Sequence, residues 1–435
     1  MHLRTQPRRV AALTFAALAV LFFAACAQQY PNSTFNPTTD FNRESTSLWN
    51  TLLGWGTIVF IIVEVILVYT IWRYRRRPGV SVEASSAMMH GNTTLEIAWT
   101  VLPALILAII AVPTVRTIFR TQAPAPANAL KVDVIGHQWW WEFKYPDYNI
   151  TTANELYLPI GRPVAFSLRT MDVIHSFWIP QLGGKRDVVS NRTNYLWFTP
   201  DSAEYTVYNG SCNEYCGASH ANMRFRVFTV PAENFEQWAA HQRSPAIIQA
   251  PAAAPASGAA AAPAPNTPAT ATPQPNAPAG NQPAATAPPT QAVGSYVFPR
   301  ERVPAHAIPS TPTPSDVSFP EGLVGDIERG RAKYSSSACI ACHKIDGNPM
   351  SVGVTGPNLT HVGSRLTIGA GLFPNDPRHM ALWIKNARKM KPLQFSSMPT
   401  LGKNEYDPVM KTVINVGGLT DQEIADIVAY LQALK

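Results

Sequence analysis

The chain places several metal-binding side chains in one short segment. Residues 211–223, SCNEYCGASHANM, contain four of them: Cys212, Cys216, His220 and Met223. A further imidazole, that of His175 in DVIHSFWIP, lies upstream. Thiolates, thioethers and imidazoles are ligands for transition metals, so these residues predict either a metal site or a disulfide-bonded loop.

Three kinds of site can be built from these residues. A disulfide between Cys212 and Cys216 is permitted in an oxidising compartment, but it leaves the histidines and the methionine without a role. A tetrahedral zinc ion accepts two cysteines and two histidines, yet it has little use for a thioether. Copper accepts all three kinds of donor, and the donors outnumber those that one ion needs. A pair of copper ions bridged by both thiolates, each with one imidazole and one weak axial donor, uses every group.

A second motif lies near the C-terminus. CIACH, residues 339–343, has the C-x-x-C-H pattern of c-type haem attachment. In that reading Cys339 and Cys342 form thioethers to the porphyrin, and His343 binds the iron. A thioredoxin-like cysteine pair is the alternative for so short a motif.

Composition limits what the rest of the chain can be. A length of 435 residues predicts about three folded units. Charged residues make up 14% of the chain, against about 25% in soluble domains. The net charge of +7 is not gathered into a dense basic stripe on a folded segment, so no nucleic-acid partner is expected. Each of the five cysteines stands in a recognisable setting, which argues against a general disulfide framework.

The N-terminus has the pattern of a secretory signal peptide. Residues 1–25 begin with three arginines and continue with the apolar run VAALTFAALAVLFF. FAAC, which ends at Cys26, resembles a bacterial lipobox, and we therefore expect Cys26 to be the lipidated first residue of the mature protein. An uncleaved anchor or ordinary cleavage are the alternatives.

Residues 26–120 predict a short N-terminal segment and a transmembrane hairpin. The runs 48–72 and 97–119 are each long enough to cross a bilayer, which takes ~20 residues. Arginines at 73–77 lie between them and predict a cytoplasmic loop, so the rest of the chain is expected on the periplasmic or outer side of a bacterial cell membrane. Glu64 lies within the first span, where it is expected to face protein or to be protonated.

The remaining sequence predicts two outer domains joined by a linker. Six short segments rich in Val, Tyr, Phe and Trp within 130–230 predict strands of a sandwich or small barrel. Residues 244–315 are expected to be a disordered linker, because the tract up to residue 299 is rich in Pro and Ala and has no charged residue. A helix is predicted near the C-terminus, since Thr420 and Glu423 have the capping-box spacing before a helically spaced apolar run.

The pattern C-x-E-x-C-x-x-x-H-x-x-M, with an upstream histidine in HSF, resembles the dinuclear copper (CuA) domain of cytochrome c oxidase subunit II. The resemblance covers residues 40–230 and implies a cupredoxin-like Greek-key β-barrel over residues 125–240. It implies these copper ligands: His175, Cys212, Cys216, His220, Met223 and the backbone carbonyl of Glu214.

The same resemblance implies roles for three further side chains. Trp139 in GHQWWWEF would be the position where electrons reach the copper site, although the aromatic residues 139–141 could equally fill the barrel wall. The Glu214 side chain would reach a magnesium ion at the boundary with subunit I. Glu96 in LEIAWTVLPALIL would stand at the cytoplasmic mouth of a proton path into subunit I.

Residues 320–435 resemble an all-α class I cytochrome c domain. TGPNLTHVGSR resembles that family's haem-edge loop, and Gly330 and Tyr430 resemble the contact between its terminal helices. The resemblance implies a methionine as the sixth iron ligand, for which Met398 in SSMPTL is preferred and Met390 is the alternative. His361 and His379 are expected at the surface.

The order of hairpin, copper domain, linker and cytochrome resembles subunit II of caa-type bacterial oxidases. This implies that electrons pass from covalent haem c to CuA and then to haem in subunit I, where oxygen is reduced to water and protons are pumped. Implied partners are subunits I and III and an upstream donor, either a cytochrome c or a quinol-oxidising complex. A CuA subunit of a nitric oxide reductase-like enzyme and a membrane-anchored copper chaperone are the alternatives.

Overall fold

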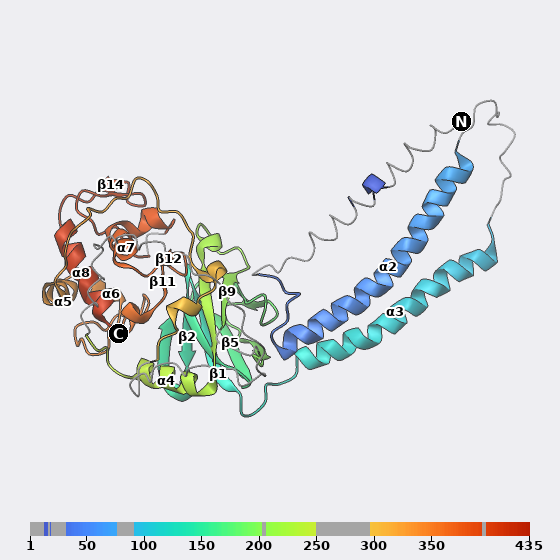
Figure 1. Ribbon diagram of the computed structural model, residues 1–435, viewed down its shortest axis with the longest axis horizontal. Coiled ribbons are helices and arrows are strands. Elements are labelled where there is room, and N and C mark those ends of the chain that lie inside the picture. Colours follow the sequence, from blue (N-terminus) through green and yellow to red (C-terminus); the bar gives the residue numbers. More distant parts are fainter. Residues whose placement is uncertain are drawn as a thin grey trace, which may run out of the picture.

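The computed structural model describes residues 13–15, 18, 32–75, 91–201, 206–248, 296–393 and 397–435. Almost all of the predicted signal peptide lies outside these residues, as does Cys26 with its predicted lipid anchor. The middle of the predicted linker, residues 249–295, lies outside them as well. The described part forms a multidomain chain with a two-helix arm, a β-sandwich and a mainly helical C-terminal domain (Figure 1).

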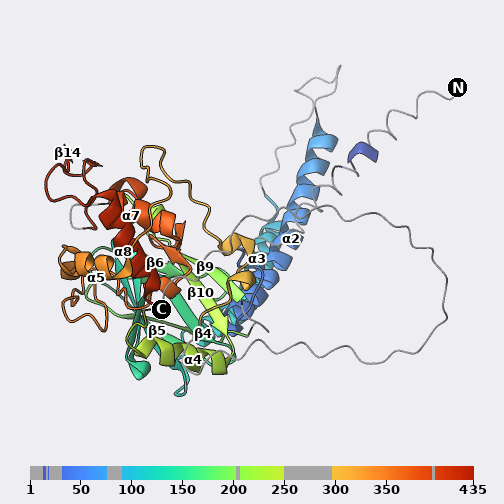
Figure 2. The same ribbon diagram turned by 60° about the vertical axis from the view of Figure 1, so that its left-hand side comes forward.

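Two long apolar helices lie side by side and project away from the globular part (Figures 1 and 2). They are α2 (Asp40–Tyr74) and α3 (Thr93–Thr121), of 35 and 29 residues. At ~1.5 Å per residue both are longer than the ~30 Å hydrocarbon core of a bilayer. Both are long and apolar enough to cross a membrane, and the predicted spans 48–72 and 97–119 fall within them.

The first turn of α2 is joined to the β-sandwich by hydrogen bonds. The Thr39 hydroxyl accepts from the backbone N–H of Asn42 at 3.1 Å, which caps the helix, and donates to the carbonyl of Leu182 at 2.5 Å. The Asp40 carboxylate accepts from the backbone N–H of Thr199 at 2.8 Å. These bonds fix the direction in which the two-helix arm leaves the globular part.

Residues 130–230 form two five-stranded sheets packed face to face, in agreement with the β-sandwich or small barrel predicted for this segment. The first sheet has, in spatial order, β3 (Ile150–Ala153), β2 (Trp140–Tyr145), β1 (Leu130–His137), β5 (Val164–Thr170) and β8 (Asn194–Phe198). The second has β4 (Glu155–Pro159), β10 (Arg224–Val230), β9 (Thr206–Cys212), β6 (His175–Trp178) and β7 (Arg186–Val188). β1 pairs with β5 and β4 with β10 in parallel, whereas the other neighbours are antiparallel.

Aromatic side chains fill the space between the sheets. Alternate residues of β2 are buried, as the two-residue period of a half-buried strand requires. Trp141 packs edge-on against Phe177 and Phe225, with ring centroids 5.6 and 5.7 Å apart. Helix α4 (Ala232–Arg243) closes one end, where Trp238 stacks on Tyr157. Two single-turn helices, η2 (Pro146–Tyr148) and η3 (His220–Asn222), complete the domain.

The predicted disordered linker over 244–315 is wrong at both of its described ends. Residues 296–315 include η4 (Arg300–Arg302) and η5 (Ala305–Ala307), and Tyr296 and Phe298 are buried in the sandwich core. Ile247 exchanges two backbone hydrogen bonds with Lys435 at the C-terminus. These ends carry apolar side chains that can be buried, which the Pro/Ala tract between them lacks.

The C-terminal domain is built from short helices around a cavity. Its helical elements are α5 (Ile327–Ser335), α6 (Cys339–Cys342), η6 (Val362–Ser364), α7 (Pro377–Met390) and α8 (Asp421–Ala433). Two small ladders depart from a purely α-helical domain: β11 (Thr367–Ile368) with β12 (Phe373–Pro374), and β13 (Tyr406–Asp407) with β14 (Thr412–Val413). The Thr420–Glu423 capping box at the start of α8 is present as predicted.

Helices α5 and α8 contact each other at Gly330. A Cβ atom at Gly330 would lie 1.9 Å from the carbonyl oxygen of Asp426 and 3.0 Å from the Cβ of Tyr430. Only glycine allows this approach, which is the contact that the sequence resemblance implied. A salt bridge of 2.9 Å between Arg329 and Asp426 lies beside it.

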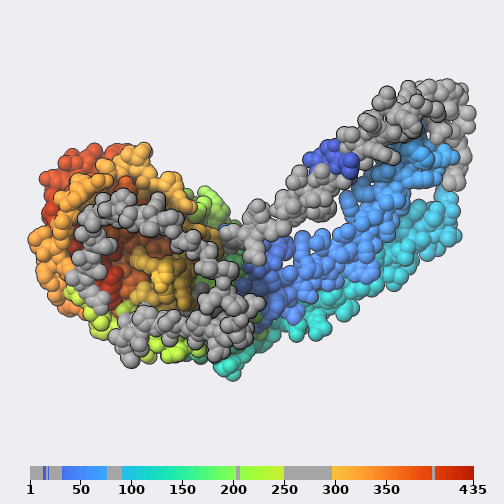
Figure 3. Space-filling view, in the orientation of Figure 1, coloured from blue at the N-terminus to red at the C-terminus, as the bar shows by residue number. Residues whose placement is uncertain are grey.

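The C-terminal domain lies against the sandwich (Figures 2 and 3). Leu366 and Leu393 of the C-terminal domain pack against the sandwich core. The sequence predicts two domains joined by a disordered linker, whereas in the structure the two domains are also in direct contact.

Candidate metal centre and haem site

The predicted copper ligands are brought together at one end of the sandwich. Cys212 ends β9, Cys216 and His220 follow on the loop to β10, and His175 begins β6. β6 pairs with β9, with Phe177 opposite Cys212, which is why residues far apart in the chain meet here. His175, Cys212 and Cys216 form a buried cluster whose donor atoms lie within 4.8 Å of one another.

The two sulfurs lie between the two imidazole nitrogens. The sulfurs of Cys212 and Cys216 are 3.8 Å apart, the His175 Nδ1 lies 3.8 Å from the Cys212 sulfur, and the His220 Nδ1 lies 3.7 Å from the Cys216 sulfur. Both cysteines are free, and their separation is far longer than the ~2.05 Å of a disulfide. Each sulfur therefore has one imidazole beside it.

Each sulfur also has one weak donor. The Met223 sulfur lies 4.0 Å from the Cys216 sulfur, and the Glu214 carbonyl oxygen lies 3.3 Å from that of Cys212. Glu214 itself is exposed. All six predicted donors thus meet in an arrangement that fits a thiolate-bridged copper pair, whereas a single tetrahedral zinc would leave donors unused.

The electrostatics of the site prepare it for a cation. The hydrogen bond from Cys216 lowers the pKa of the Cys212 thiol, and the resulting negative charge raises the pKa of Cys216. Copper binds the thiolate form of cysteine, so a metal ion that binds here would release the thiol protons.

Asp172 orients His175, a role that the sequence did not reveal. The Asp172 carboxylate lies 2.8 Å from His175 Nε2 and also accepts from the backbone N–H of Gln138 at 2.6 Å. Burial opposes protonation of His175, but Asp172 and Cys212 outweigh it and raise the pKa of this imidazole. A proton on Nε2 leaves the Nδ1 lone pair directed at the metal site. In the sequence, the only indication of this contact is that Asp172 lies three residues before His175.

Replacing Asp172 with asparagine is expected to weaken copper binding by about 10- to 100-fold, because the neutral amide no longer favours the metal-binding tautomer of His175. Competition with a copper chelator measures the affinity. Asp187→Asn, a change at an exposed residue of β7, is the matched control. Equal affinity for the Asp172→Asn and control proteins would contradict the role of Asp172.

Trp139 connects the metal loop to the neighbouring domain. Its indole N–H donates to the carbonyl of Cys216 at 2.9 Å, and the side chain is 1% exposed. Trp139 and Trp141 both belong to the sandwich core, as the alternative interpretation allowed, but Trp140 does not. Trp140 is half-buried, stacks on His137 and lines the cavity of the C-terminal domain together with Trp139.

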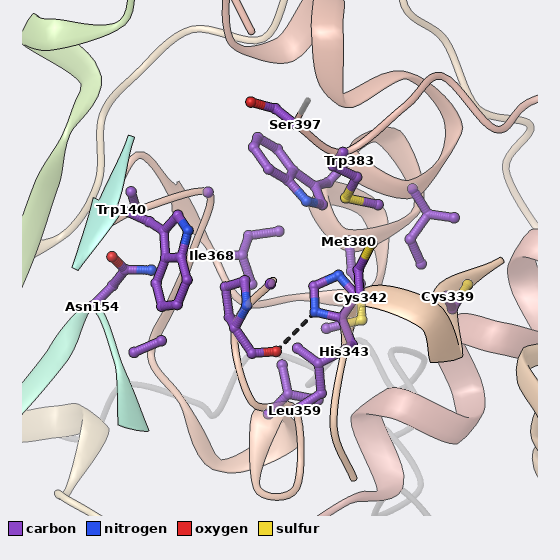
Figure 4. A pocket seen from close by; sticks show the side chains of 18 of the residues that line it. Trp140, Asn154, Cys339, Cys342, His343, Leu359, Ile368, Met380, Trp383 and Ser397 are labelled. Carbon is purple, nitrogen blue, oxygen red and sulfur yellow. Dashed lines mark hydrogen bonds between the residues drawn. The ribbon is translucent and has the colours of Figure 1, made fainter. Parts of the chain in front are cut away.

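That cavity has a volume of about 240 Å³ and a mostly apolar lining. In Figure 4, Trp140 and Asn154 of the sandwich lie on one side, and Cys339, Cys342 and His343 on the other. The two cysteines are free, so both sulfurs are available for thioether bonds. The position of the C-x-x-C-H motif at an apolar cavity fits a covalently bound haem.

His343 is oriented as an iron ligand. Its Nδ1 lies 2.8 Å from the carbonyl oxygen of Pro357, to which it donates, and Nε2 remains available (Figure 4). Burial lowers the pKa of His343, which favours the neutral imidazole that binds iron. A Cβ at Gly356 would lie 2.8 Å from the His343 ring, so the TGPNL segment needs glycine at this point.

The methionines of the C-terminal domain differ in their surroundings. Met398 and Met380 line the cavity, whereas Met390, the alternative ligand, packs with Val317 and Leu372. The Met380 sulfur accepts from the side-chain N–H of Gln432 at 3.7 Å. Met398 is therefore the methionine whose sulfur has no such partner among the described residues and that also lines the cavity.

Other predicted positions have mixed outcomes. Glu96 lies in the first turn of α3 and Glu64 lies within α2, both away from the two sites. His379 is half-buried and pairs with Asp376. The expectation that His361 lies at the surface is wrong, because His361 is buried between the domains.

Comparisons with known proteins agree with this division. Three family models match: "Cytochrome C oxidase subunit II, transmembrane domain" at residues 33–117, "Cytochrome C oxidase subunit II, periplasmic domain" at 149–230, and "Cytochrome c" at 327–435. Cytochrome c oxidase subunit 2 of Alkalihalophilus pseudofirmus is 27% identical over 391 residues, which is 87% of this chain and 83% of that protein.

Two further comparisons concern parts of the chain. A protein of Rickettsia bellii described as "Probable cytochrome c oxidase subunit 2" is 32% identical over 225 residues, covering 47% of this chain and 81% of that protein. The crystal structure of the periplasmic domain of subunit II of cytochrome oxidase of Bradyrhizobium japonicum is 27% identical, with a TM-score of 0.26. It covers 28% of this chain and 97% of that one.

Proposed function

Because this chain belongs to the cytochrome c oxidase subunit II family, we propose that it is the subunit through which electrons reach a haem–copper oxidase. Electrons pass from the haem of its own cytochrome c domain to the copper pair, and then to haem in subunit I. There oxygen is reduced to water and protons are pumped. The observation that carries the proposal is the pair of cysteine sulfurs 3.8 Å apart, each with its own imidazole.

The bound metals supply one-electron chemistry, and the residues of the chain supply position and environment. Asp172 holds the His175 ring in one tautomer, and Pro357 does the same for His343. Burial of the cysteines keeps water away from the copper ligands. Trp139 donates its indole N–H to the copper loop and lines the haem cavity, and we assign it as the residue that links the two centres.

The proposal extends to the surroundings of the chain. The hairpin α2–α3 would lie beside subunits I and III in a bacterial cell membrane, with both redox domains on the periplasmic side and a lipid on Cys26. Glu96, in the first turn of α3, would stand at the mouth of a proton path into subunit I. The exposed side chain of Glu214 would reach a magnesium ion at the boundary with subunit I. The donor would be a cytochrome c or a quinol-oxidising complex.

Metal analysis of the full-length chain, purified with its partner subunits, tests this function. We expect a pair of copper atoms for each covalent haem and a mixed-valence copper signal in electron paramagnetic resonance. Zinc in place of the copper pair would overturn the oxidase assignment. A copper chaperone is disfavoured because His220 and the Met223 sulfur complete the donor set within the same loop.

A further inference from the structure

The two outer domains bury a carboxylate where they meet. Glu155 lies on β4 of the sandwich and is 3% exposed. Its Oε1 accepts from the backbone N–H groups of Leu366 and Thr367 at 2.8 and 3.0 Å, and from the Thr367 hydroxyl at 3.3 Å. All three donors belong to the cytochrome domain. A buried carboxylate is costly unless it is hydrogen-bonded, so this site needs the second domain in place.

Two guanidinium groups lie near Glu155; burial raises the pKa of this carboxyl, and the charge of Arg365 acts against that shift. Arg226 is directly opposite Glu155 in the β4–β10 pair, and Arg365 comes from the cytochrome domain. Arg226 donates to the carbonyls of Ala307 at 2.7 Å and Gly371 at 3.2 Å, and thus joins residues on both sides of the domain boundary. Burial lowers the pKa of Arg226 to about 10, and the charge of Glu155 acts against that shift.

A second set of contacts lies beside the copper loop. The buried ammonium group of Lys391 donates to the carbonyl of Trp139 at 2.6 Å. The Ser219 hydroxyl, on the loop that carries the copper ligands, donates to the carbonyl of Pro392. The cytochrome segment 391–393 is thereby held against Trp139, which is itself bonded to Cys216.

We propose that Glu155 locks the cytochrome domain onto the copper-binding domain, so that the haem cavity stays closed over Trp139 and transfer to copper follows one fixed intramolecular route. The electron-transfer part of this inference rests on the proposed function, whereas the docking of the two domains does not. With Trp139 covered, an external protein donor can deliver electrons only to the cytochrome domain. A freely diffusing domain on a tether would leave Trp139 open for much of the time.

The test uses the full-length chain in its oxidase complex with Glu155→Ala, and with Glu155→Gln, which keeps the acceptor oxygen and the side-chain volume. Glu233→Gln, at an exposed residue of α4, is the matched control. Hydroxyl-radical labelling of Trp139 measures undocking. Trp139 lies in the turn between β1 and β2, two strands of the first sheet, whereas Glu155 lies on β4 of the second sheet, so a purely local defect at Glu155 would not expose Trp139. The rate of haem-to-copper transfer after flash reduction is measured at low and high salt.

We expect Trp139 labelling in Glu155→Ala to rise about tenfold or more, as loss of a buried charged hydrogen-bond partner predicts. The rate of haem-to-copper transfer in Glu155→Ala should fall and become salt-dependent. Both the labelling and the transfer rate should change less in Glu155→Gln, and the Glu233→Gln control should match the unchanged protein. Trp139 labelling in Glu155→Ala at the level of the control would overturn the lock. Because labelling needs no copper and no electron transfer, failure of the proposed function would leave this result interpretable.

Discussion

A chain with Cys216 replaced by serine is expected to lose the mixed-valence copper signal. The Cys216 sulfur has three other donors around it, since it lies 3.8 Å from the Cys212 sulfur, 3.7 Å from His220 Nδ1 and 4.0 Å from the Met223 sulfur. A serine hydroxyl is a harder and far less acidic ligand, and it cannot replace a bridging thiolate. With the Cys212 thiolate alone, the chain would no longer hold a pair of copper ions.

The expected fall in oxygen uptake with a reduced donor is more than about 100-fold, because loss of a supporting residue alone costs about 10- to 100-fold. Covalent haem should remain, since residues 339–343 lie in the other domain. Ser211→Ala, at the neighbouring strand position, is the matched control and should keep both metals. Retention of the mixed-valence signal by Cys216→Ser would remove the bridging role of this sulfur.

Replacing Met398 with leucine is expected to convert the haem from low spin to high spin. Met398 is half-buried and lies on the loop before α8. It lines the same cavity as the residues of the C-x-x-C-H motif. Leucine has a similar volume but no sulfur, so the domain should fold while the iron loses its sixth ligand. The reduction potential should fall by on the order of 100 mV, within the ~0.8 V range that axial ligands control.

Visible absorption spectra and a redox titration of the full chain measure this effect. Met390→Leu, a buried methionine that does not line the cavity, is the matched control and should leave the spectrum unchanged. A low-spin spectrum in Met398→Leu would assign the sixth ligand to another residue, and Met380→Leu would then be the variant to compare. Met380 is the remaining methionine that lines the cavity.

The copper loop could be predicted from the sequence because most of its geometry is local. Four side-chain ligands lie within twelve residues, Cys212 to Met223, and a loop that short brings its donors together in few ways. C-x-x-C-H is local in the same sense, since both cysteines lie on the single-turn helix α6 and the histidine follows it directly. The apolar length of the two long helices is likewise a property of continuous sequence.

The role of Asp172 could not be predicted, because it depends on the direction in which one imidazole nitrogen points. The contacts between the two domains could not be predicted either, because a charged residue in a strand or loop is ordinarily solvated. The buried charged residues concerned are Glu155, Arg226 and Lys391. The linker prediction erred at Tyr296 and Phe298, which composition placed with the Pro/Ala tract although both side chains are buried.

The sequence by itself therefore determined the chemistry of this protein: which donors are present, how they are spaced, and which segments are apolar enough to cross a membrane. Only the tertiary structure decided how the two centres face each other. Ligand spacing is a property of a few consecutive residues. The docking of the two domains depends on contacts between Glu155 and residues 366 and 367, which lie 211 and 212 positions further along the chain. Such a contact becomes favourable only when both domains are folded and the carboxylate is buried.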